Sequence, residues 1–295
     1  MAIAAAAATR LGAGTRAAAW AAARKVVPLI AVLGALWGLW EGYRALWVAT
    51  GWTWPFVVDD TSMPHIHAIV AQLFQPSRLN GPLLIRVLLD STLFTAREAA
   101  VGFAIGASVG FVLGVVLVHS RLLERGLLPY IVASQTIPLL AIAPMVVVGL
   151  GSKGVTGWVS VSVTAAYLTF FPVTINALRG LQSADPRALE LMRSYAANRW
   201  AILWKLRVPA SMPYLFAALK VSATASVVGA VISELPSGIQ DGLGGEILVF
   251  HQYYTLDPTK LWATNLIAAV LGILFFLVVI AAERAVVRRA PENVA

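Results

Sequence analysis

The sequence predicts an all-α integral membrane protein with about six transmembrane helices. Hydrophobic residues make up 59% of the 295 residues and charged residues only 12%, whereas a soluble domain carries about a quarter charged residues. The apolar runs are continuous and about 20 residues long, which suits membrane-spanning helices and not the alternating strands of a β-barrel. Because the sequence has no cysteine, disulfides and thiolate metal sites are excluded.

Six apolar stretches are long enough to cross a bilayer. They lie at about residues 26–48, 99–118, 127–150, 155–178, 214–233 and 261–282. With the N-terminus inside, the inner segments hold about 15 Lys and Arg and the outer segments about 5. The positive-inside rule therefore predicts that both termini are cytoplasmic, and it accounts for the net charge of +8 without nucleic acid as a partner.

The N-terminal part divides into a basic tail and a first span. Residues 1–25 are Ala-rich and contain no acid, and we expect a retained cytoplasmic tail in preference to a cleaved leader. The first span carries Glu41 and Arg44. Because they are three residues apart, they share one side of a helix, which favours an ion pair between them.

The outer segment after the first span contains residues that metals use. His65 and His67 lie near Asp59 and Asp60. Their spacing matches no recognised metal site, so we interpret them as ordinary loop residues and predict no metal site.

The second span carries a regular series of glycines. Gly102, Gly106, Gly110 and Gly114 are each four residues apart. This spacing places all four on one face of a helix, where they allow the backbone of another helix to approach closely. The pattern predicts tight helix packing inside the bundle.

Two later segments are expected to be irregular. Pro138 and Pro144 interrupt the third span and leave backbone carbonyls without helical partners. The segment Glu234–Lys260 is expected to be an outer loop, and its glycine run at Gly242–Gly245 is no dinucleotide fingerprint because no strand precedes it.

The segment Asp185–Pro213, called the elbow from here on, is too polar to cross a bilayer. Asp185 is a good N-cap, and Pro186 suits the first position of a helix. A break is expected at Ala196–Asn198, with Asn198 capping a second short helix that Pro209 and Pro213 stop. The elbow thus predicts two short helices on one membrane face, between spans four and five.

The elbow resembles the signature cytoplasmic loop of binding-protein-dependent ABC importer permeases. That pattern reads E-A-A, then Gly at the seventh position, then I-x-L-P at positions seventeen to twenty. Glu190 holds the first position, and Leu206, Val208 and Pro209 hold the I, L and P positions of I-x-L-P. The sequence departs from the pattern at the two Ala positions, which hold Leu191 and Met192, and at the Gly position, which holds Ala196.

The resemblance extends over residues 83–289 and is greatest for the branch that imports nitrate, sulfonates and taurine. It is carried further by the stretches Thr136–Gly154, Phe170–Pro186 and Ser233–Gly245. We therefore divide the chain into a cytoplasmic tail at 1–25, a first span with an outer connecting segment at 26–82, a permease core at 83–289 and a tail at 290–295.

The resemblance implies a permease in the bacterial inner membrane that imports a small solute, with the elbow docking on a cytoplasmic ATPase subunit. It also implies a second permease copy and a periplasmic or lipid-anchored substrate-binding protein, in a membrane-lipid environment. The chain itself would hold no cofactor, because the ATPase subunit binds ATP. The residues expected at the coupling contact are Arg187, Glu190, Arg193, Ser194, Ala196, Ala197, Asn198 and Arg199.

The solute pathway is expected to run past polar residues of the spans. The candidates are Gln135, Tyr167, Asn176, Lys220, Ser222 and Ser226. The branch resemblance implies nitrate, a sulfonate or taurine. The run Glu234–Gly245 is similar to that of relatives which carry pyrimidines or riboflavin-like compounds, so a heterocyclic solute is the alternative.

Three other readings compete with an ABC permease. A secondary transporter would place acids deep in its spans, and Glu41 is the only acid expected well inside one. The elbow could be a plain interfacial anchor, since basic amphipathic helices often are. An enzyme is not expected, because no nucleotide-binding motif and no nucleophile–base–acid set can be assembled from the sequence.

Overall fold

The computed structural model describes residues 24, 27–28, 30–54 and 57–287. The chain forms two compact units, Met1–Val70 and Ala71–Ala295. Throughout the described part the regular structure is helical and no strand occurs, apart from an isolated bridge between Pro76 and Leu83. The all-α fold class is therefore confirmed. The expected tails at 1–25 and 290–295 lie outside the described residues, except for Arg24.

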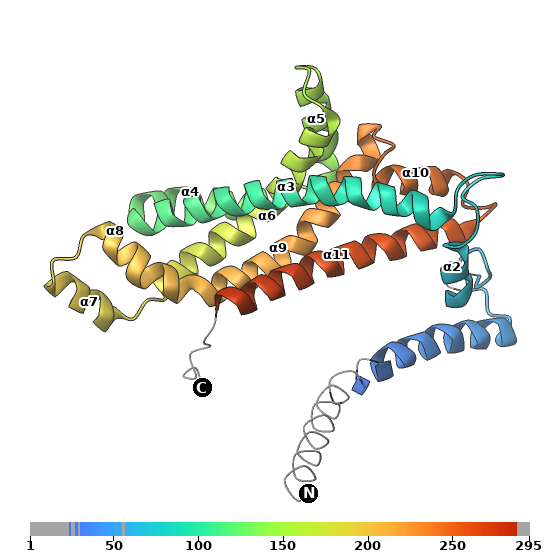
Figure 1. Ribbon diagram of the computed structural model, residues 1–295, viewed down its shortest axis with the longest axis horizontal. Coiled ribbons are helices and arrows are strands. Elements are labelled where there is room, and N and C mark those ends of the chain that lie inside the picture. The colour runs from blue at the N-terminus through green and yellow to red at the C-terminus, as the bar shows by residue number, and fades with distance from the viewer. Residues whose placement is uncertain (1–23, 25–26, 29, 55–56, 288–295) are drawn as a thin grey trace, which may run out of the picture. The chain divides into compact units, whose positions relative to one another are not determined.

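Four long helices, α3, α6, α9 and α11, lie side by side in the second unit (Figure 1). The short helices of the elbow, α7 and α8, connect α6 to α9 through one π-helical segment, η1. The bounds are α2 Ile66–Gln72, α3 Leu84–His119, α4 Arg121–Ser134, α5 Leu139–Gly151, α6 Gly157–Gln182, α7 Pro186–Ser194, α8 Arg199–Ile202, η1 Leu203–Arg207, α9 Val208–Ser237, α10 Leu243–Gln252 and α11 Pro258–Val286.

Within the described residues, four helical segments are long and apolar enough to cross a membrane. They are Leu84–His119, Gly157–Gln182, Arg199–Ser237 and Pro258–Val286. Helices α4 and α5 together have the composition of a fifth span, but they meet at an angle of 97°. The third span is therefore no single helix. Pro138 starts α5 with an extended ψ of 124°, whereas Pro129 and Pro144 lie inside their helices.

Helix α3 packs on α6 through the four glycines that the sequence singled out. Gly102, Gly106, Gly110 and Gly114 are all buried. A Cβ atom on Gly102 would lie 2.5 Å from the Cβ atom of Ala165 in α6, and a Cβ atom on Gly114 would lie 2.6 Å from that of Ala177. No real side chain fits at such distances, so the predicted close helix packing is confirmed.

Two boundaries differ from the prediction. The second span, predicted at 99–118, is part of a longer helix, α3, which begins at Leu84 and has 36 residues, because no Pro interrupts it. The prediction of a loop at Glu234–Lys260 is wrong, because this segment contains α10 and its first residues belong to α9. Gly238, at φ 69°, ends α9 in the left-handed conformation that glycine adopts without strain.

The first unit contains a helix that covers residues 30–50 of the first predicted span. The expected ion pair between Glu41 and Arg44 is wrong. Arg44 instead pairs with Asp60 at 2.5 Å, and Oε2 of Glu41 lies 2.7 Å from Nδ1 of His65. Both pairs connect the helix to the segment that follows it. Residue spacing within one helix cannot reveal such contacts.

The glycine contact yields a test of the packing. We expect Gly106→Ala to destabilise the protein by about 1–3 kcal/mol, because a Cβ atom would lie 2.6 Å from the Cβ atom of Thr169. Thermal unfolding in detergent measures this. The matched control is Gly272→Ala in α11, where no atom lies within 4 Å of the new Cβ and helix propensity predicts up to about 1 kcal/mol of stabilisation. Equal effects of the two changes would contradict the packing role.

Candidate functional site

Helix α7, the first helix of the elbow, buries none of its residues. Asp185 caps it, because its Oδ1 accepts a hydrogen bond from the backbone N–H of Arg187 at 2.9 Å, and Pro186 occupies the first turn. Leu191 is 58% exposed, and Arg187, Glu190 and Arg193 also lie at the surface. A helix that leaves both apolar and charged side chains uncovered is a candidate docking surface.

Helix α7 ends in a regular C-cap before α8 begins. The N–H of Ala197 donates to the carbonyl of Met192 at 3.0 Å, and the N–H of Ala196 donates to that of Arg193 at 2.9 Å, which is the bond pattern of a Schellman motif. Ala196 holds the left-handed position with φ 52°. Glycine usually holds this position, because a side chain there costs about 1–2 kcal/mol. The Ala that departs from the family pattern therefore adopts the conformation for which the pattern uses Gly.

The second half of the elbow continues into the bundle without a stop. Oδ1 of Asn198 accepts a hydrogen bond from the N–H of Ala201 at 2.7 Å and so caps α8. The prediction that Pro209 and Pro213 end this helix is wrong, because η1 links α8 directly to α9. In η1 the N–H of Val208 bonds to the carbonyl of Leu203. This hydrogen bond spans five residues, as in a π-helix, and α9 begins one residue before Pro209. The missing N–H of Pro209 therefore falls in the first turn of α9, where the helix needs no donor.

A hydrophobic cluster fixes the end of the elbow to the bundle. Leu203 is buried against Leu181 of α6 and Val208 of α9, and Phe111 and Val115 of α3 pack on the same cluster. The elbow therefore has an exposed half, α7, and an anchored half that contacts three long helices. A force applied to α7 would reach α3, α6 and α9 through this cluster.

The structure distributes the predicted pathway residues over several helices. Gln135 lies at the break between α4 and α5, and the hydroxyl of Tyr167 donates to the carbonyl of Ser134 beside it. Asn176 donates to the carbonyl of Pro172 within α6 at 2.8 Å. The structure thus brings Gln135 and Tyr167 together at one place, while Asn176 lies elsewhere on α6.

The predicted pathway residues of α9 are enclosed or paired. Ser222 and Ser226 are fully buried, and the hydroxyl of Ser226 donates to the carbonyl of Ala223 at 2.9 Å. Nζ of Lys220 forms an ion pair with Glu283 of α11 at 3.0 Å. Lys220 therefore contacts α11, Ser222 donates to the carbonyl of Thr169 in α6 at 3.4 Å, and Ser226 bonds within α9. A role in solute passage stays a prediction.

Two fully buried acids, Glu98 of α3 and Glu234 of α9, were missed in the sequence. The expectation that Glu41 is the only acid well inside a span is therefore wrong. Oε1 of Glu234 accepts a hydrogen bond from the hydroxyl of Thr95 at 2.7 Å, and Oε2 accepts one from the N–H of Gly244 at 2.5 Å. Both carboxylate oxygens of Glu98 are buried without a hydrogen-bond partner in the part of the chain described.

The glycine run at the start of α10 makes room for the carboxylate of Glu234. A Cβ atom on Gly244 would lie 2.6 Å from the Cβ atom of Glu234, and one on Gly242 would collide with its carboxylate. The N–H of Leu243 donates to the hydroxyl of Thr95 at 2.9 Å. The run therefore joins α3, α9 and α10 through one buried polar cluster, and the combination of a glutamate, a nearby glycine run and a Ser/Thr is the signal that could have revealed it.

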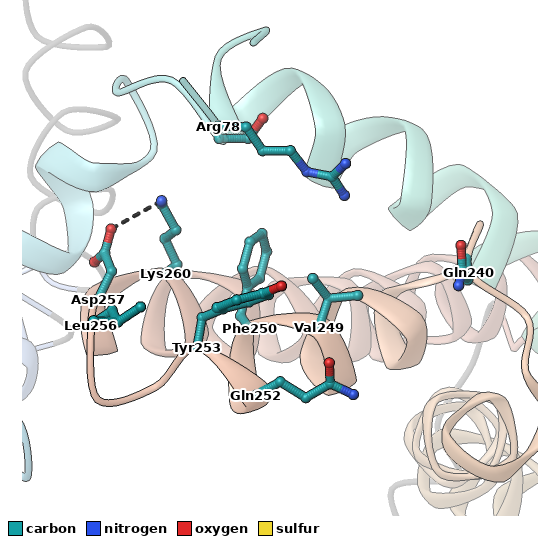
Figure 2. A pocket seen from close by; sticks show the side chains of 10 residues that line it. Arg78, Gln240, Val249, Phe250, Gln252, Tyr253, Leu256, Asp257 and Lys260 are labelled. Atoms are coloured by element: carbon teal, nitrogen blue, oxygen red, sulfur yellow. Dashed lines mark ion pairs between the residues drawn. The ribbon is translucent and has the colours of Figure 1, made fainter. Parts of the chain in front are cut away.

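A cavity of about 560 Å³ lies between α10 and the segment before α3. Figure 2 shows Arg78 on one side of it and Phe250 and Tyr253 on the other. Lys260 also lines it and pairs with Asp257 at 3.1 Å. Burial raises the pKa of the nearby Glu246 carboxyl, and the positive charge of Arg78 opposes part of that shift. Cationic and aromatic side chains here could hold a small polar or aromatic group.

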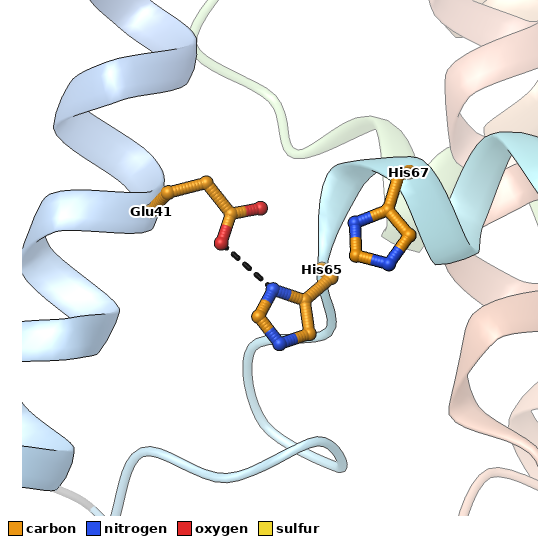
Figure 3. A group of neighbouring side chains, drawn as sticks. All are labelled: Glu41, His65 and His67. Carbon is orange, nitrogen blue, oxygen red and sulfur yellow. Dashed lines mark hydrogen bonds and ion pairs between the residues drawn. The ribbon is translucent and has the colours of Figure 1, made fainter.

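In the first unit, Glu41, His65 and His67 come together (Figure 3). Their potential ligand atoms all lie within 4.8 Å of one another, and two His with one carboxylate is a ligand set that zinc accepts. The hydrogen bond from His65 to Glu41 accounts for the arrangement without a metal. Asp59 takes no part, since its carboxylate accepts hydrogen bonds from the N–H groups of Thr61 and Ser62 at 3.1 and 2.7 Å.

Comparison with protein families identifies the class of the bundle and elbow. The family model described as "Binding-protein-dependent transport system inner membrane component" matches residues 105–290, which is more than half of the chain. The chain belongs to this family. The match contains the whole elbow and confirms the resemblance seen in the sequence.

Relatives of this chain are named for the transport of different solutes. A formylaminopyrimidine transport permease of Halalkalibacterium halodurans is 32% identical over 68% of this chain and 82% of its own length. A riboflavin transport permease of Chloroflexus aurantiacus is 31% identical over 61% of this chain and 63% of its own length. A putative aliphatic sulfonates transport permease of Bacillus subtilis is 29% identical over 62% of this chain and 60% of its own length.

Solved structures agree with the family at the level of the fold. A chain of a crystallised amino acid ABC transporter superposes with a TM-score of 0.55. It is 17% identical, and the match covers 68% of this chain and 95% of that chain. The fold of the matched part of this chain is therefore similar to that of an ABC transporter chain.

The C-cap of α7 can be tested by one substitution. We expect Ala196→Gly to stabilise α7 by about 1 kcal/mol, because glycine adopts the left-handed conformation without a Cβ clash. Hydrogen exchange of the α7 amides should slow by about fivefold. The control Ala197→Gly, at a position without positive φ, should speed exchange, since glycine there only adds backbone freedom. Slower exchange in both variants would contradict the assignment.

Proposed function

We propose that this protein is the membrane-spanning subunit of an ATP-driven importer for a small solute. The observation that carries the proposal is the match of residues 105–290 to the inner membrane component family. The sequence contains no nucleotide-binding motif, so the energy for import has to come from a partner subunit that binds ATP. The permease itself would need no cofactor and no catalytic group.

The elbow would be the contact with that ATPase subunit. The exposed helix α7 offers Arg187, Glu190, Arg193 and Ser194, and the turn after it adds Ala196–Arg199. Closure of the ATPase pair would move α7, and the cluster around Leu203 would pass the motion to α3, α6 and α9. The long helices would then rock as rigid bodies and open the pathway alternately to either side.

The proposed assembly contains six spans per permease, with both termini in the cytoplasm. The helix at 30–50 would supply the first span, and the bent pair α4 and α5 would supply the third. The distribution of Lys and Arg supports this orientation. A second permease copy would complete the pathway, and a periplasmic or lipid-anchored binding protein would deliver the solute to the inner membrane.

For the solute, the proposal favours a polar heterocycle over an anion such as nitrate, a sulfonate or taurine. The formylaminopyrimidine permease aligns over more of its length than the sulfonate permease does. The ion pair of Lys220 with Glu283 also supports it, because a paired lysine offers no net positive charge to an anion. The aromatic rings of Phe250 and Tyr253 at the cavity of Figure 2 suit a planar solute.

A secondary transporter driven by an ion gradient is not favoured. The buried Glu98 and Glu234 fit the expectation of acids within the helices of such a transporter. However, Glu234 is held by hydrogen bonds from Thr95 and Gly244, which suits a structural joint between helices, and the family match points to an importer with a separate energy source.

The coupling role predicts a specific defect. We expect Glu190→Arg to lower solute-stimulated ATP hydrolysis by about tenfold or more in the reconstituted complex, since a reversed charge on α7 would disrupt a charge pair at the docking contact. The permease should still insert and fold, because Glu190 is exposed. The control is the same charge reversal at exposed Asp241, outside the elbow. Normal coupling in Glu190→Arg would contradict the docking role.

The solute class can be decided with the binding protein that serves this permease. Its melting temperature would be measured with pyrimidines, flavins, sulfonates and nitrate. A ligand at 100 times its dissociation constant stabilises by about 2.7 kcal/mol, a shift that is easy to detect. We expect a pyrimidine or flavin to produce it. Stabilisation by a sulfonate or nitrate alone would overturn the heterocycle assignment and leave the importer assignment intact.

A further inference from the structure

The elbow and the junction between α3 and α4 enclose a strongly basic cavity of about 500 Å³. Arg121 begins α4, Arg193 lies in α7, Arg199 begins α8 and Arg207 ends η1. His119 at the end of α3 adds a fifth basic side chain. No acidic residue lines this cavity. Segments distant in the sequence thus converge to place like charges together.

These arginines lack an acidic partner. None of them takes part in an ion pair within the ranges that the structure describes. The Nε atom of Arg207 is also buried without a hydrogen-bond partner. Like charges that share one cavity lie within about a Debye length, ~8–10 Å, so salt screens their repulsion incompletely. A bound anion would both offset this repulsion and accept the unused N–H of Arg207.

The surroundings of the cavity indicate where the anion comes from. Trp200 and Trp204 lie in the chain between Arg199 and Arg207 and are 65% and 57% exposed. The ring of Trp200 lies 6.2 Å from that of His119. Exposed Trp side chains at the ends of membrane helices concentrate at the level of the lipid headgroups. The cavity therefore lies where phospholipid phosphates are abundant.

We propose that this basic cavity binds the phosphate of an anionic phospholipid. The planar guanidinium groups match phosphate oxygens in a bidentate manner, and basic pockets between spans on the cytoplasmic side suit such headgroups. The leaflet, but not the binding itself, rests on the proposed topology. The headgroup would join α7 and α8 to the start of α4 and hold the elbow at a fixed height on the membrane. Arg193 and Arg199 belong both to this cavity and to the proposed coupling contact, so the test compares the permease with and without its ATPase subunits.

The test uses the full-length permease, purified in detergent and freed of lipid, with and without its ATPase subunits. The probes are dioctanoyl phosphatidylglycerol, dioctanoyl phosphatidylcholine and inorganic phosphate, and the readouts are the melting temperature and the bound lipid seen by native mass spectrometry. The variant Arg193→Gln/Arg207→Gln removes two cavity charges. The control Arg284→Gln removes an exposed charge in the last turn of α11, outside the cavity.

We expect phosphatidylglycerol alone to raise the melting temperature of the wild type. The double variant should bind it about thirtyfold more weakly, since each basic residue at an anionic surface contributes about a factor of five. Without lipid, the double variant should melt no lower than the wild type, because it has lost repulsive charges. Arg284→Gln should respond like the wild type.

Five results would overturn the proposal. If phosphatidylglycerol stabilised the double variant as much as the wild type, the cavity would not be the binding site. The same conclusion would follow if Arg284→Gln lost as much lipid binding as the double variant. Equal stabilisation by inorganic phosphate would assign the site to a free anion. A lower melting temperature of the lipid-free double variant would indicate a purely structural role. Loss of the lipid effect when the ATPase subunits bind would assign the charges to a protein contact.

Discussion

The packing of α3 on α6 is the constraint on which the rest of the bundle depends. Lipid tails are as apolar as leucine side chains, so helices in a membrane gain little from the hydrophobic effect and need close contact of their surfaces. Four glycines at intervals of four residues allow α3 to reach the backbone of α6. Glycines also allow close contact where α9 meets α6: Gly229 faces Ala165, and Gly180 faces Ser211. The long helices can therefore move only as packed bodies.

Helix α9 extends from the elbow to α10. Its first residue, Val208, belongs to the cluster that anchors the elbow. Near its other end, Glu234 accepts hydrogen bonds from Thr95 of α3 and Gly244 of α10. Removing one partner of a buried carboxylate strongly destabilises the folded protein, so these hydrogen bonds hold α3, α9 and α10 together. Movement of α7 would therefore be passed along α9 to the region of α10 and its cavity.

The sequence predicted the features that local signals specify. The spacing of the glycines defines one helix face, and Asp185 and Asn198 are caps that act on residues two or three positions away. The partners of Glu41, Lys220 and Glu234 could not be predicted, because each lies on another segment of the chain and no spacing within one helix reveals it. The continuation of the elbow through η1 was missed because Pro209 was interpreted as a helix end, whereas it lies in the first turn of α9, where its missing N–H needs no partner.

The most direct test of the account is the energy source of transport. The purified permease would be reconstituted in proteoliposomes with its ATPase subunits and its solute-loaded binding protein, and uptake would be measured with ATP and with an imposed ion gradient. We predict that uptake requires ATP and both partners and is unaffected when an ionophore collapses the gradient. Uptake by the permease alone, driven by the gradient without ATP, would contradict the assignment of this chain as a subunit of an ATP-driven importer.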